Sequence, residues 1–406
     1  MVSIKNKFNA IVDFVLLIVN SKIINIVSCS SYSTQLGFLT AYLYQNKSRK
    51  ISKIIQKNEI YVFLLFPTRS DRSIRNVCNF KKVLGEQKFF IFKIDNFVLR
   101  LLVYLSLKFV YLIKNKNNIF LWQTRYRWIN DLFGSSRYKI YLPVPRFKVI
   151  LFGDGFLNLM PVDKPPWLIK TKKIKKVKLI DSQDLYKSYH HFKITNKKYN
   201  FKSELINKKF IKDFLFRYIY NDYDNQLTKV LSKIKTLVKD FPNEKKGIYI
   251  FPTTTFFETN RCNLENEINM YVDFLRKSEA FKFSCLLIKP HPGSSKIKNR
   301  NFLKKLKEED DFQQTLILEP YLFDKDISLA NIPLEIIITF IIDYFEVENI
   351  LLACCSTASL SVKTLFPKLK MDYAFGSFLL EKYVNVNYIN QRLEQEKMIK
   401  NAAENS

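Results

Sequence analysis

The sequence predicts an α/β protein with two doubly wound parallel sheets, one in each half of the chain. Three observations predict this class. Short apolar runs typical of buried strands alternate with segments of helical spacing, and the alternation starts again after Pro242. With 406 residues, the chain is also long enough for two domains that each bury a core. Hydrophobic residues make up 47% of the chain, which excludes global disorder.

The first half contains five runs that we predict as strands: Ile23–Ser28, Ile60–Phe66, Phe89–Ile94, Ile119–Gln123 and Lys148–Phe152. Helical spacing follows the first of them over Gln35–Tyr42. Phe97–Lys114 is predicted as an apolar helix with a cationic flank, which either faces the core or docks on an anionic membrane. The lysine-rich segment Ile169–Lys212 is weakly periodic and is interpreted as surface insertions.

A basic amphipathic helix over Asn225–Phe241 ends before Pro242, and we place the domain boundary there, between residues 1–240 and 241–406. The second half repeats the alternation. Helices are predicted over Asn263–Arg276 and from Ile332 onward. The predicted strands are Gly247–Phe251, Phe283–Lys289, Leu316–Glu319 and Asn349–Cys355.

Polar clusters follow three of these strands. Asp154 lies between Gly153 and Gly155, His291 lies between two prolines, and Ser356 precedes Thr357. Open α/β sheets bind ligands at the carboxyl ends of their strands, so the three clusters are candidates for one site. A carboxylate can take a proton from an attacking hydroxyl, and a histidine can protonate or stabilise a departing anion. Hydroxyls and amides at a helix N-terminus can hold a phosphate.

The order and setting of these clusters resemble those of bacterial sialyltransferases and polysialyltransferases of the GT-B type. That family has an acidic motif with glycine after a strand of its first domain, a His-Pro in its second, and a Ser/Thr pair further on. Two softer similarities are Ser28–Leu36 and Ile332–Glu335. The resemblance implies an acceptor-side domain in residues 1–240 and a donor-binding domain in residues 241–406, facing a central cleft.

The resemblance also implies an inverting, metal-independent transfer of sialic acid, or a related nonulosonic acid, from a CMP-activated donor without a cofactor. Asp154 would be the general base for the acceptor hydroxyl, and His291 the general acid toward the CMP phosphate. The residues implied to bind the phosphate or the CMP are Ser356, Thr357, Pro292 and Thr254. Gly153 occupies the position that commonly supplies the base in this family, so Asp154 or another residue must take that role.

The net charge of +29 comes from 66 basic and 37 acidic residues, which we describe as spread along the chain. AT-rich coding bias explains part of it, and the remainder favours an anionic partner: an anionic glycan acceptor, an anionic membrane surface or nucleic acid. Three alternatives stay open, namely a CMP-Kdo or other ulosonic-acid transferase, an inactive glycan-binding GT-B protein, and a basic nucleic-acid-binding protein. The last is disfavoured because no helix-turn-helix, RRM or zinc module is visible. The sequence also has no P-loop, GxGxxG or HExxH motif.

Six cysteines without CxxC spacing indicate buried free thiols in a reducing compartment. The apolar run Phe8–Val19 resembles a signal peptide or anchor, but Asp13 interrupts it and no small-residue cleavage site follows. No uninterrupted apolar stretch is long enough to span a bilayer. We therefore expect a cytoplasmic protein, peripheral on the inner membrane at most, which acts in the synthesis of a surface polysaccharide such as a capsule or of lipooligosaccharide.

Overall fold

The computed structural model describes most of the chain from residue 247 onward, namely residues 247–291, 293–318, 334–342, 349–356 and 358–404. Before residue 247 it describes the strands β1 to β9 and the single residues Leu16, Ser21, Tyr42, Leu105, Lys209, Phe210, Asp213, Ser232 and Thr236. The chain divides into two compact units, Met1–Ile211 and Lys212–Ser406. The predicted domain boundary at residues 240–241 stays a prediction.

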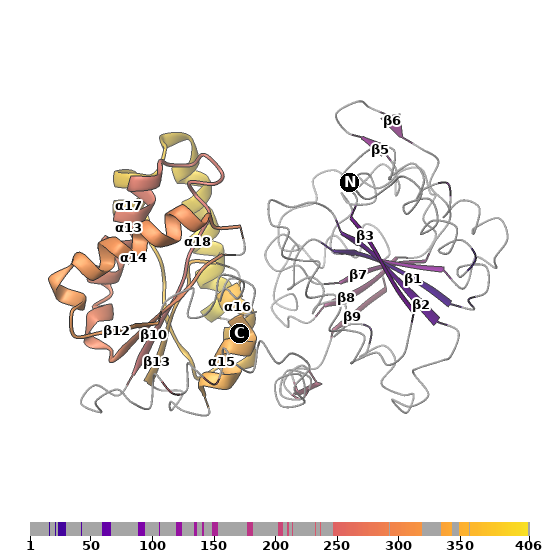
Figure 1. The fold of residues 1–406 in the computed structure, drawn as a ribbon, viewed down its shortest axis with the longest axis horizontal. Helices are drawn as coiled ribbons and strands as arrows, with labels where there is room; N and C mark the ends of the chain where they lie inside the picture. The colour runs from indigo at the N-terminus through magenta and orange to yellow at the C-terminus, as the bar shows by residue number, and fades with distance from the viewer. Residues whose placement is uncertain are drawn as a thin grey trace, which may run out of the picture. The chain divides into compact units, whose positions relative to one another are not determined.

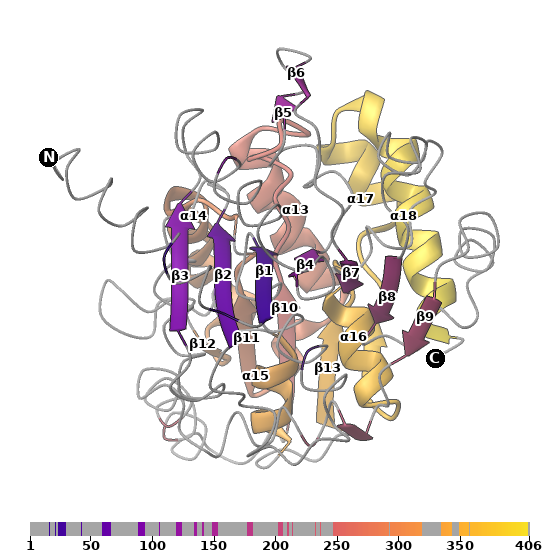
Figure 2. The ribbon, with the colours of Figure 1, turned by 90° about the vertical axis from the view of Figure 1, so that its right-hand side faces the viewer.

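The first unit contains a seven-stranded parallel sheet with the strand order β3-β2-β1-β4-β7-β8-β9 (Figure 2). Its strands are β1 (Ile23–Cys29), β2 (Glu59–Leu65), β3 (Lys88–Lys93), β4 (Ile119–Gln123), β7 (Lys148–Phe152), β8 (Val177–Asp181) and β9 (Lys202–Leu205). A short antiparallel pair, β5 (Gly134–Ser135) and β6 (Ile140–Tyr141), stands apart from it.

The second unit contains a five-stranded parallel sheet with the order β12-β11-β10-β13-β14 (Figure 1). The strands are β10 (Ile248–Pro252), β11 (Cys285–Lys289), β12 (Leu316–Leu318), β13 (Ile350–Ala353) and β14 (Lys370–Asp372). Every residue of β10 and β11 is buried, as expected for central strands that helices cover on both faces.

Helices flank this second sheet. They are α13 (Leu264–Lys277), α14 (Lys296–Glu308), α15 (Leu334–Ile341), α16 (Ala358–Leu365), α17 (Gly376–Tyr383) and α18 (Val386–Glu404), with short 3-10 turns η3 (Ala280–Lys282) and η4 (Asp310–Phe312). Helix α13 packs beside α14 and α15 beside α16, and Figure 1 shows the two pairs on opposite sides of the sheet. Phe251 of β10 packs against the α13 rings of Tyr271 and Phe274, with ring centroids 5.1 and 5.8 Å away.

The two sheets share one strand order. Counted along each unit, the order is 3-2-1-4-5, the doubly wound arrangement, which the seven-stranded sheet extends by two strands. The direction in which successive strands are added to the sheet therefore reverses between β1 and β4 in the first unit and between β10 and β13 in the second. The predicted α/β class with two doubly wound Rossmann-like sheets, the domain type of GT-B proteins, is confirmed at the level of the sheets. The predicted cleft between the domains stays a prediction.

Most predicted strands lie where the sequence places them, and β4 and β7 match to the residue. The interpretation of Ile169–Lys212 as surface insertions is wrong, because β8 and β9 come from this segment and extend the first sheet. Strand β8 contains the apolar residues Val177, Leu179 and Ile180 and pairs with β7, but the surrounding lysines obscure this short apolar pattern in the sequence. The predicted helices Gln35–Tyr42, Phe97–Lys114 and Asn225–Phe241 lie outside the described residues, apart from Tyr42, Leu105, Ser232 and Thr236.

Four of the six cysteines fall among the fully described residues. Cys262, Cys285, Cys354 and Cys355 are buried free thiols, as predicted. Burial raises the pKa of Cys262 and of Cys354 to about 12, and that of Cys285 to about 11. These thiols are therefore protonated at neutral pH and unreactive. Within the described helices, none combines the length and the apolar character that crossing a bilayer requires.

Candidate functional site

The candidate site lies at the carboxyl edge of the second sheet, where three adjacent parallel strands end. Thr253–Thr255 follow β10, His291 follows β11, and Ser356 follows β13. Strand β10 lies between β11 and β13, so the loops are spaced by about 4.8 Å per strand. The gap between β10 and β13 is the point where the strand order reverses, and ligands of open α/β sheets bind outside such a point.

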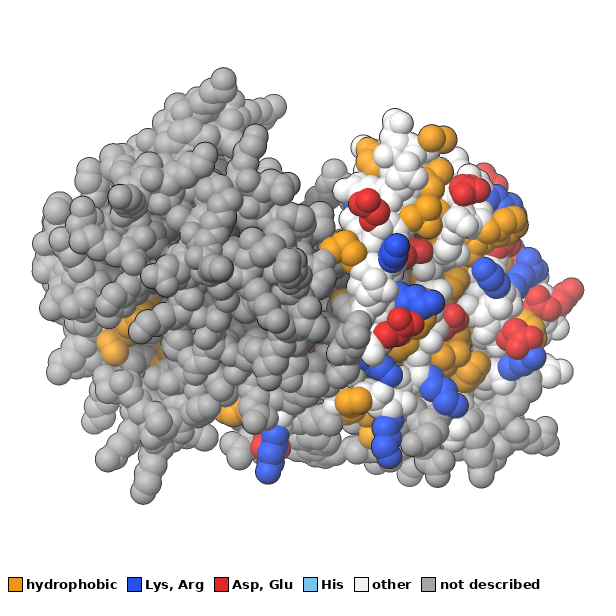
Figure 3. Space-filling view, turned by 180° about the vertical axis from the view of Figure 1, so that it is seen from behind, with side chains coloured by type: hydrophobic (Ala, Val, Ile, Leu, Met, Phe, Trp, Pro, Cys, Tyr) orange, Lys and Arg blue, Asp and Glu red, His pale blue; other side chains and the backbone are white. Residues whose placement is uncertain are grey.

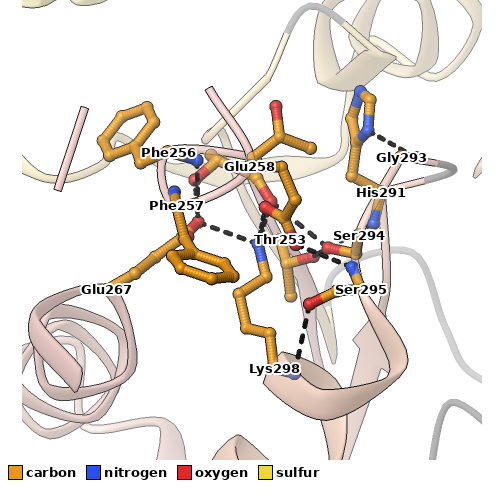
Figure 4. A network of polar contacts seen from close by, with 12 residues as sticks. Thr253, Phe256, Phe257, Glu258, Glu267, His291, Gly293, Ser294, Ser295 and Lys298 are labelled. Carbon is orange, nitrogen blue, oxygen red and sulfur yellow. Dashed lines mark hydrogen bonds and ion pairs between the residues drawn. The ribbon is translucent and has the colours of Figure 1, made fainter. Parts of the chain in front are cut away.

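Hydrogen bonds hold the turn that carries His291 against the end of β10. The amide of His291 donates to Oγ1 of Thr253 (3.0 Å), and the amide of Thr253 donates to the carbonyl of Lys289 (2.9 Å). The amide of Ser294 donates to the carbonyl of His291 (2.9 Å), which closes the turn. The amide of Gly293 donates to Nδ1 of the His291 ring (3.0 Å). The ring is therefore fixed by backbone groups, and Figure 4 shows its other nitrogen pointing away from the turn.

Behind this turn, a buried ionic network joins the β10 loop to α14 (Figure 4). The side chain of Lys298, which is 1% exposed, donates to Oε2 of Glu258 (2.7 Å) and Oε1 of Glu267 (3.1 Å). It also donates to the carbonyl of Thr254 (2.8 Å). The other oxygen of Glu258 accepts from the amide of Ser295 (2.6 Å), whose hydroxyl caps α14. The start of α14 is thus tied to the loop after β10.

Glu267 organises the loop from the α13 side. It is fully buried, and its carboxylate accepts from the amides of Phe256 (3.1 Å) and Phe257 (2.7 Å). It also accepts from the hydroxyl of Tyr271 and from Oγ1 of Thr254 (3.0 Å). A carboxylate that accepts several backbone and hydroxyl hydrogen bonds fixes the loop in one shape.

Thr254 belongs to the buried network. Its side chain is 6% exposed and its hydroxyl bonds to Glu267 and Tyr271, and its role in phosphate binding stays a prediction. The next residue, Thr255, is half-buried, and the space beside Cα of Gly293 is bounded by Cγ2 of Thr255 and by Nδ1 of His291. Thr255 therefore lies beside the turn that carries His291.

Three polar groups at this edge have hydrogen-bonding capacity that the described residues do not use. The hydroxyls of Thr255 and Ser356 and the Nε2 atom of His291 make no hydrogen bond within the described part of the chain. Thr255 and Ser356 are half-buried and His291 is exposed, so these groups face solvent. The outward groups of the three adjacent loops are thus the ones open to a ligand.

The end of β13 is held from behind. Arg392 of α18, 7% exposed, donates to the carbonyl of Cys355 (2.8 Å), and the hydroxyl of Ser359 donates to the carbonyl of Ala353 (3.1 Å). The guanidinium of Arg392 is oriented by Glu396 at 3.0 Å. These contacts position Ser356 at the start of α16, where helix N–H groups favour an anion.

Burial and nearby charges shift the pKa values of His291 and Lys289. Burial by surrounding protein and the nearby charges of Lys289 and Lys298 lower the pKa of His291 to about 4, against an opposing effect of Glu258. The His291 side chain is itself exposed, so water screens part of this effect. Burial also lowers the pKa of Lys289 to about 7, with Glu335 acting in the opposite direction.

Several predicted site residues lie outside the described residues, namely Gly153, Asp154, Gly155, Pro292 and Thr357. The chain places the first three directly after β7, which ends at Phe152 in a parallel sheet. The predicted position of Asp154 after a strand is therefore supported, and its role as base stays a prediction. His291 and Ser356 lie at one sheet edge as predicted.

Sequence reasoning missed the residues that support the site: Glu258, Glu267, Lys289, Lys298 and Arg392. Glu258 and Lys298 are separated by 40 positions, and no local period connects them. Among the described residues, no group of three or more His, Cys, Asp or Glu could hold a metal ion. The predicted independence from metals and cofactors stays a prediction.

No protein-family profile matches the sequence, and no curated protein matches it. Among solved structures, the chain is similar to a UDP-GlcNAc 2-epimerase from Methanocaldococcus jannaschii, with a TM-score of 0.48 and 11% identity over 94% of this chain and 91% of that one. It is also similar to the N-terminal domain of a trehalose-6-phosphate phosphatase from Candida albicans, with a TM-score of 0.40 and 10% identity over 95% and 94%. A third similar structure, titled trehalose-6-phosphate from E. coli bound with UDP-2-fluoro glucose, has a TM-score of 0.39 and 10% identity over 94% and 96%. These TM-scores are below 0.5, so the fold assignment rests on the two sheets themselves.

Proposed function

We propose that the chain is an inverting glycosyltransferase that moves sialic acid, or a related nonulosonic acid, from a CMP-activated donor to a glycan acceptor. The observation that carries this proposal is the set of unused polar groups on Thr255, His291 and Ser356. They belong to three adjacent strand ends beside the reversal point of a doubly wound sheet. A nucleotide phosphate fits such an edge, because hydroxyls and a helix N-terminus both favour it.

The proposed reaction is the one implied by the resemblance to GT-B sialyltransferases, placed on the residues of this chain. In the proposed step the acceptor hydroxyl loses its proton to Asp154 and its oxygen bonds to the anomeric carbon of the sugar. The bond between that carbon and the phosphate oxygen breaks, and CMP departs with the electron pair. His291 assists the departure, while Thr255, Ser356 and Thr357 bind the phosphate. Attack and departure on opposite faces invert the anomeric centre.

The distribution of charge supports an anionic acceptor on the side of the first unit. Residues 1–211 contain 39 basic and 11 acidic residues, whereas residues 212–406 contain 27 and 26. The expectation of a charge spread along the whole chain is therefore wrong, since almost all of the excess positive charge lies in the first unit. Figure 3 shows basic and acidic side chains interspersed on the described face of the second unit. An acidic glycan would be attracted to the first unit by its overall field.

The deciding experiment incubates purified protein with CMP-sialic acid and sialylated or unsialylated acceptors, and follows the release of CMP. We expect acceptor-dependent CMP release that Asp154→Asn and His291→Ala both reduce strongly. Arg300→Ala, which removes an exposed side chain from α14, is the matched control and should release CMP at the wild-type rate. Undiminished release by His291→Ala would reject the proposed site.

Two alternatives are separated by the same assay. Turnover with CMP-Kdo but not with CMP-sialic acid would assign the chain to another ulosonic-acid donor. Because the first unit is so basic, nucleic acid is the alternative of a different class, and strong salt-sensitive DNA binding without affinity for CMP would favour it. Binding of CMP without any turnover would indicate an inactive glycan-binding protein, in line with Gly153 at the usual base position. We propose that the enzyme works in the cytoplasm, at the inner membrane, on a surface polysaccharide or lipooligosaccharide.

A further inference from the structure

The hydrogen bond between the Gly293 amide and the His291 ring determines which ring nitrogen carries a proton. The lone pair of a backbone amide nitrogen is delocalised into the carbonyl, so the Gly293 N–H can only donate. Its acceptor, Nδ1 of His291 at 3.0 Å, must therefore have a free lone pair. A neutral ring in this turn consequently carries its proton on Nε2.

The turn leaves the ring little freedom to adopt the other tautomer. The backbone of His291 is fixed on both sides, by its amide on Thr253 and by its carbonyl on Ser294. A methyl group at Gly293 would lie 3.3 Å from Nδ1, a tight contact that the ring could relieve only by shifting from its place against the amide. Moving the ring proton to Nδ1 would break the hydrogen bond from Gly293. It would also bring the Nδ1 hydrogen against the amide hydrogen of Gly293.

The charged groups that face the ring also disfavour the imidazolium form. They are Lys289 at the end of β11, Lys298 on α14 and, with the opposite effect, Glu258 in the loop after β10. Desolvation by burial is the largest cause of the shift, and with these charges it lowers the pKa of His291 to about 4. Protonation would also require Nδ1 to give up the Gly293 amide. The ring is therefore neutral at pH 7, with Nε2–H directed outward (Figure 4).

We infer that His291 acts as a neutral Nε2–H hydrogen-bond donor to the departing phosphate, with the Gly293 amide as the group that fixes its tautomer, and that it does not transfer a proton. This inference rests on the proposed function for the identity of the anion. The expected role of His291 as general acid is revised accordingly.

The step balances without a proton from His291. The acceptor proton goes to Asp154, the electron pair of the breaking carbon–oxygen bond goes to the phosphate, and the ring proton stays on Nε2. The departing phosphate monoester has its second pKa near 6, so it is a stable dianion at neutral pH. A hydrogen bond to this developing charge is sufficient, since hydrogen bonds to charged groups contribute about 1.5–3 kcal/mol.

The first test observes the ring directly and needs no substrate. Nitrogen-15 spectra of histidine-labelled protein contain three histidines, and His291→Ala assigns the signal. We expect His291 to remain neutral with Nε2 protonated from about pH 5.5 to pH 8. An ordinary histidine, with a pKa of about 6.5, would titrate within this range. An Nδ1-protonated ring, or titration near the ordinary value, would overturn the inference even if the enzyme is a sialyltransferase.

The second test separates hydrogen-bond donation from proton transfer. Glutamine places a neutral N–H donor near the position of Nε2 but has no titratable proton. Relative to wild type, His291→Ala should reduce the rate of CMP release by roughly 10- to 150-fold. His291→Gln should recover a large part of that loss with an unchanged pH profile. Equal loss in both variants would show that the proton itself is needed. If the wild type neither binds CMP nor turns over, the proposed function fails, while the nitrogen-15 spectra still decide the tautomer.

Discussion

At the scale of single residues, Lys298 is the centre of the site's support. Its three ammonium hydrogens meet three acceptors, on Thr254, Glu258 and Glu267, and the side chain is 1% exposed. A buried ion pair contributes little compared with a well-packed apolar pair, but removal of one partner leaves an uncompensated buried charge. Lys298 is therefore needed to balance the negative charges of Glu258 and Glu267.

Replacing Lys298 with methionine should destabilise the protein strongly. Methionine keeps the length of the side chain but leaves Glu267, which is fully buried, without its cation. We expect a loss of about 3–5 kcal/mol in the free energy of unfolding, measured by urea denaturation. Lys304→Met is the matched control on the same helix, because its ion pair with Glu308 is exposed, and it should change stability by less than about 1 kcal/mol. A Lys298→Met variant as stable as this control would contradict the role given to the network.

Glu258 should make the stability of the protein fall in acid. Burial by itself raises the pKa of this carboxyl, but hydrogen bonds from Lys298 and Ser295 outweigh it, and the pKa is lowered in the folded protein. A lowered folded pKa means that the carboxylate stabilises the fold above the unfolded value of about 4.3, and that this contribution is lost as pH falls through the folded value.

The prediction is checked by urea denaturation of wild type and Glu258→Gln at about pH 7, 5, 4 and 3. Glutamine keeps the shape of the side chain without its charge, so the variant should be less stable than wild type at neutral pH, and the two should converge in acid. A constant difference across this range would show that Glu258 does not titrate with folding.

At the scale of elements, the turn between β11 and α14 positions His291 through Gly293. The backbone of Gly293 does not lie in the left-handed region, so alanine can adopt its conformation, but the added methyl would press on the ring at 3.3 Å. We expect Gly293→Ala to unfold at nearly the wild-type urea concentration while the titration of His291 moves toward its ordinary pKa. Lys296→Ala, an exposed change in the same segment, should leave the His291 spectrum unchanged. If the ring titrates identically in Gly293→Ala, the amide does not fix its tautomer.

The strands could be predicted well from the sequence, but the residues that support the site could not. The reasons are physical. Strands such as β7 and β11 are short apolar runs, and burial in a parallel sheet selects such runs locally. His291 and Ser356 were found because each follows such a run. No periodic signal shows which of three consecutive threonines is buried, so the sequence does not reveal that Thr254 is buried and Thr255 half-buried. The contact of Glu258 with Lys298 joins distant positions, and only the fold reveals it.

At the scale of the whole molecule, the two units have sheets with the same strand order but very different net charges. The first unit carries an excess of 28 positive charges over residues 1–211, and the second is nearly neutral. Sheet architecture therefore does not explain the charge. A long-range field of one sign raises the rate of encounter with a polyanion and weakens as salt is added.

A polyanion should consequently bind through the first unit. With a photo-crosslinkable heparin as probe, we expect cross-linked peptides to come predominantly from residues 1–211, and binding to weaken steeply with ionic strength. The nearly neutral second unit of the same molecule serves as the internal comparison. Cross-links distributed equally over both units would show that the charge excess does not guide binding.

The enclosure of Lys298 also provides a reporter within one short peptide. Lys296 and Ile297 precede it and are exposed, whereas Lys298 is enclosed. A reagent that modifies amines will therefore reach Lys296 at once, and Lys298 only when the junction between the β10 loop and α14 opens. The ratio of the two modifications over time measures how often this part of the molecule opens, and a bound nucleotide should slow it.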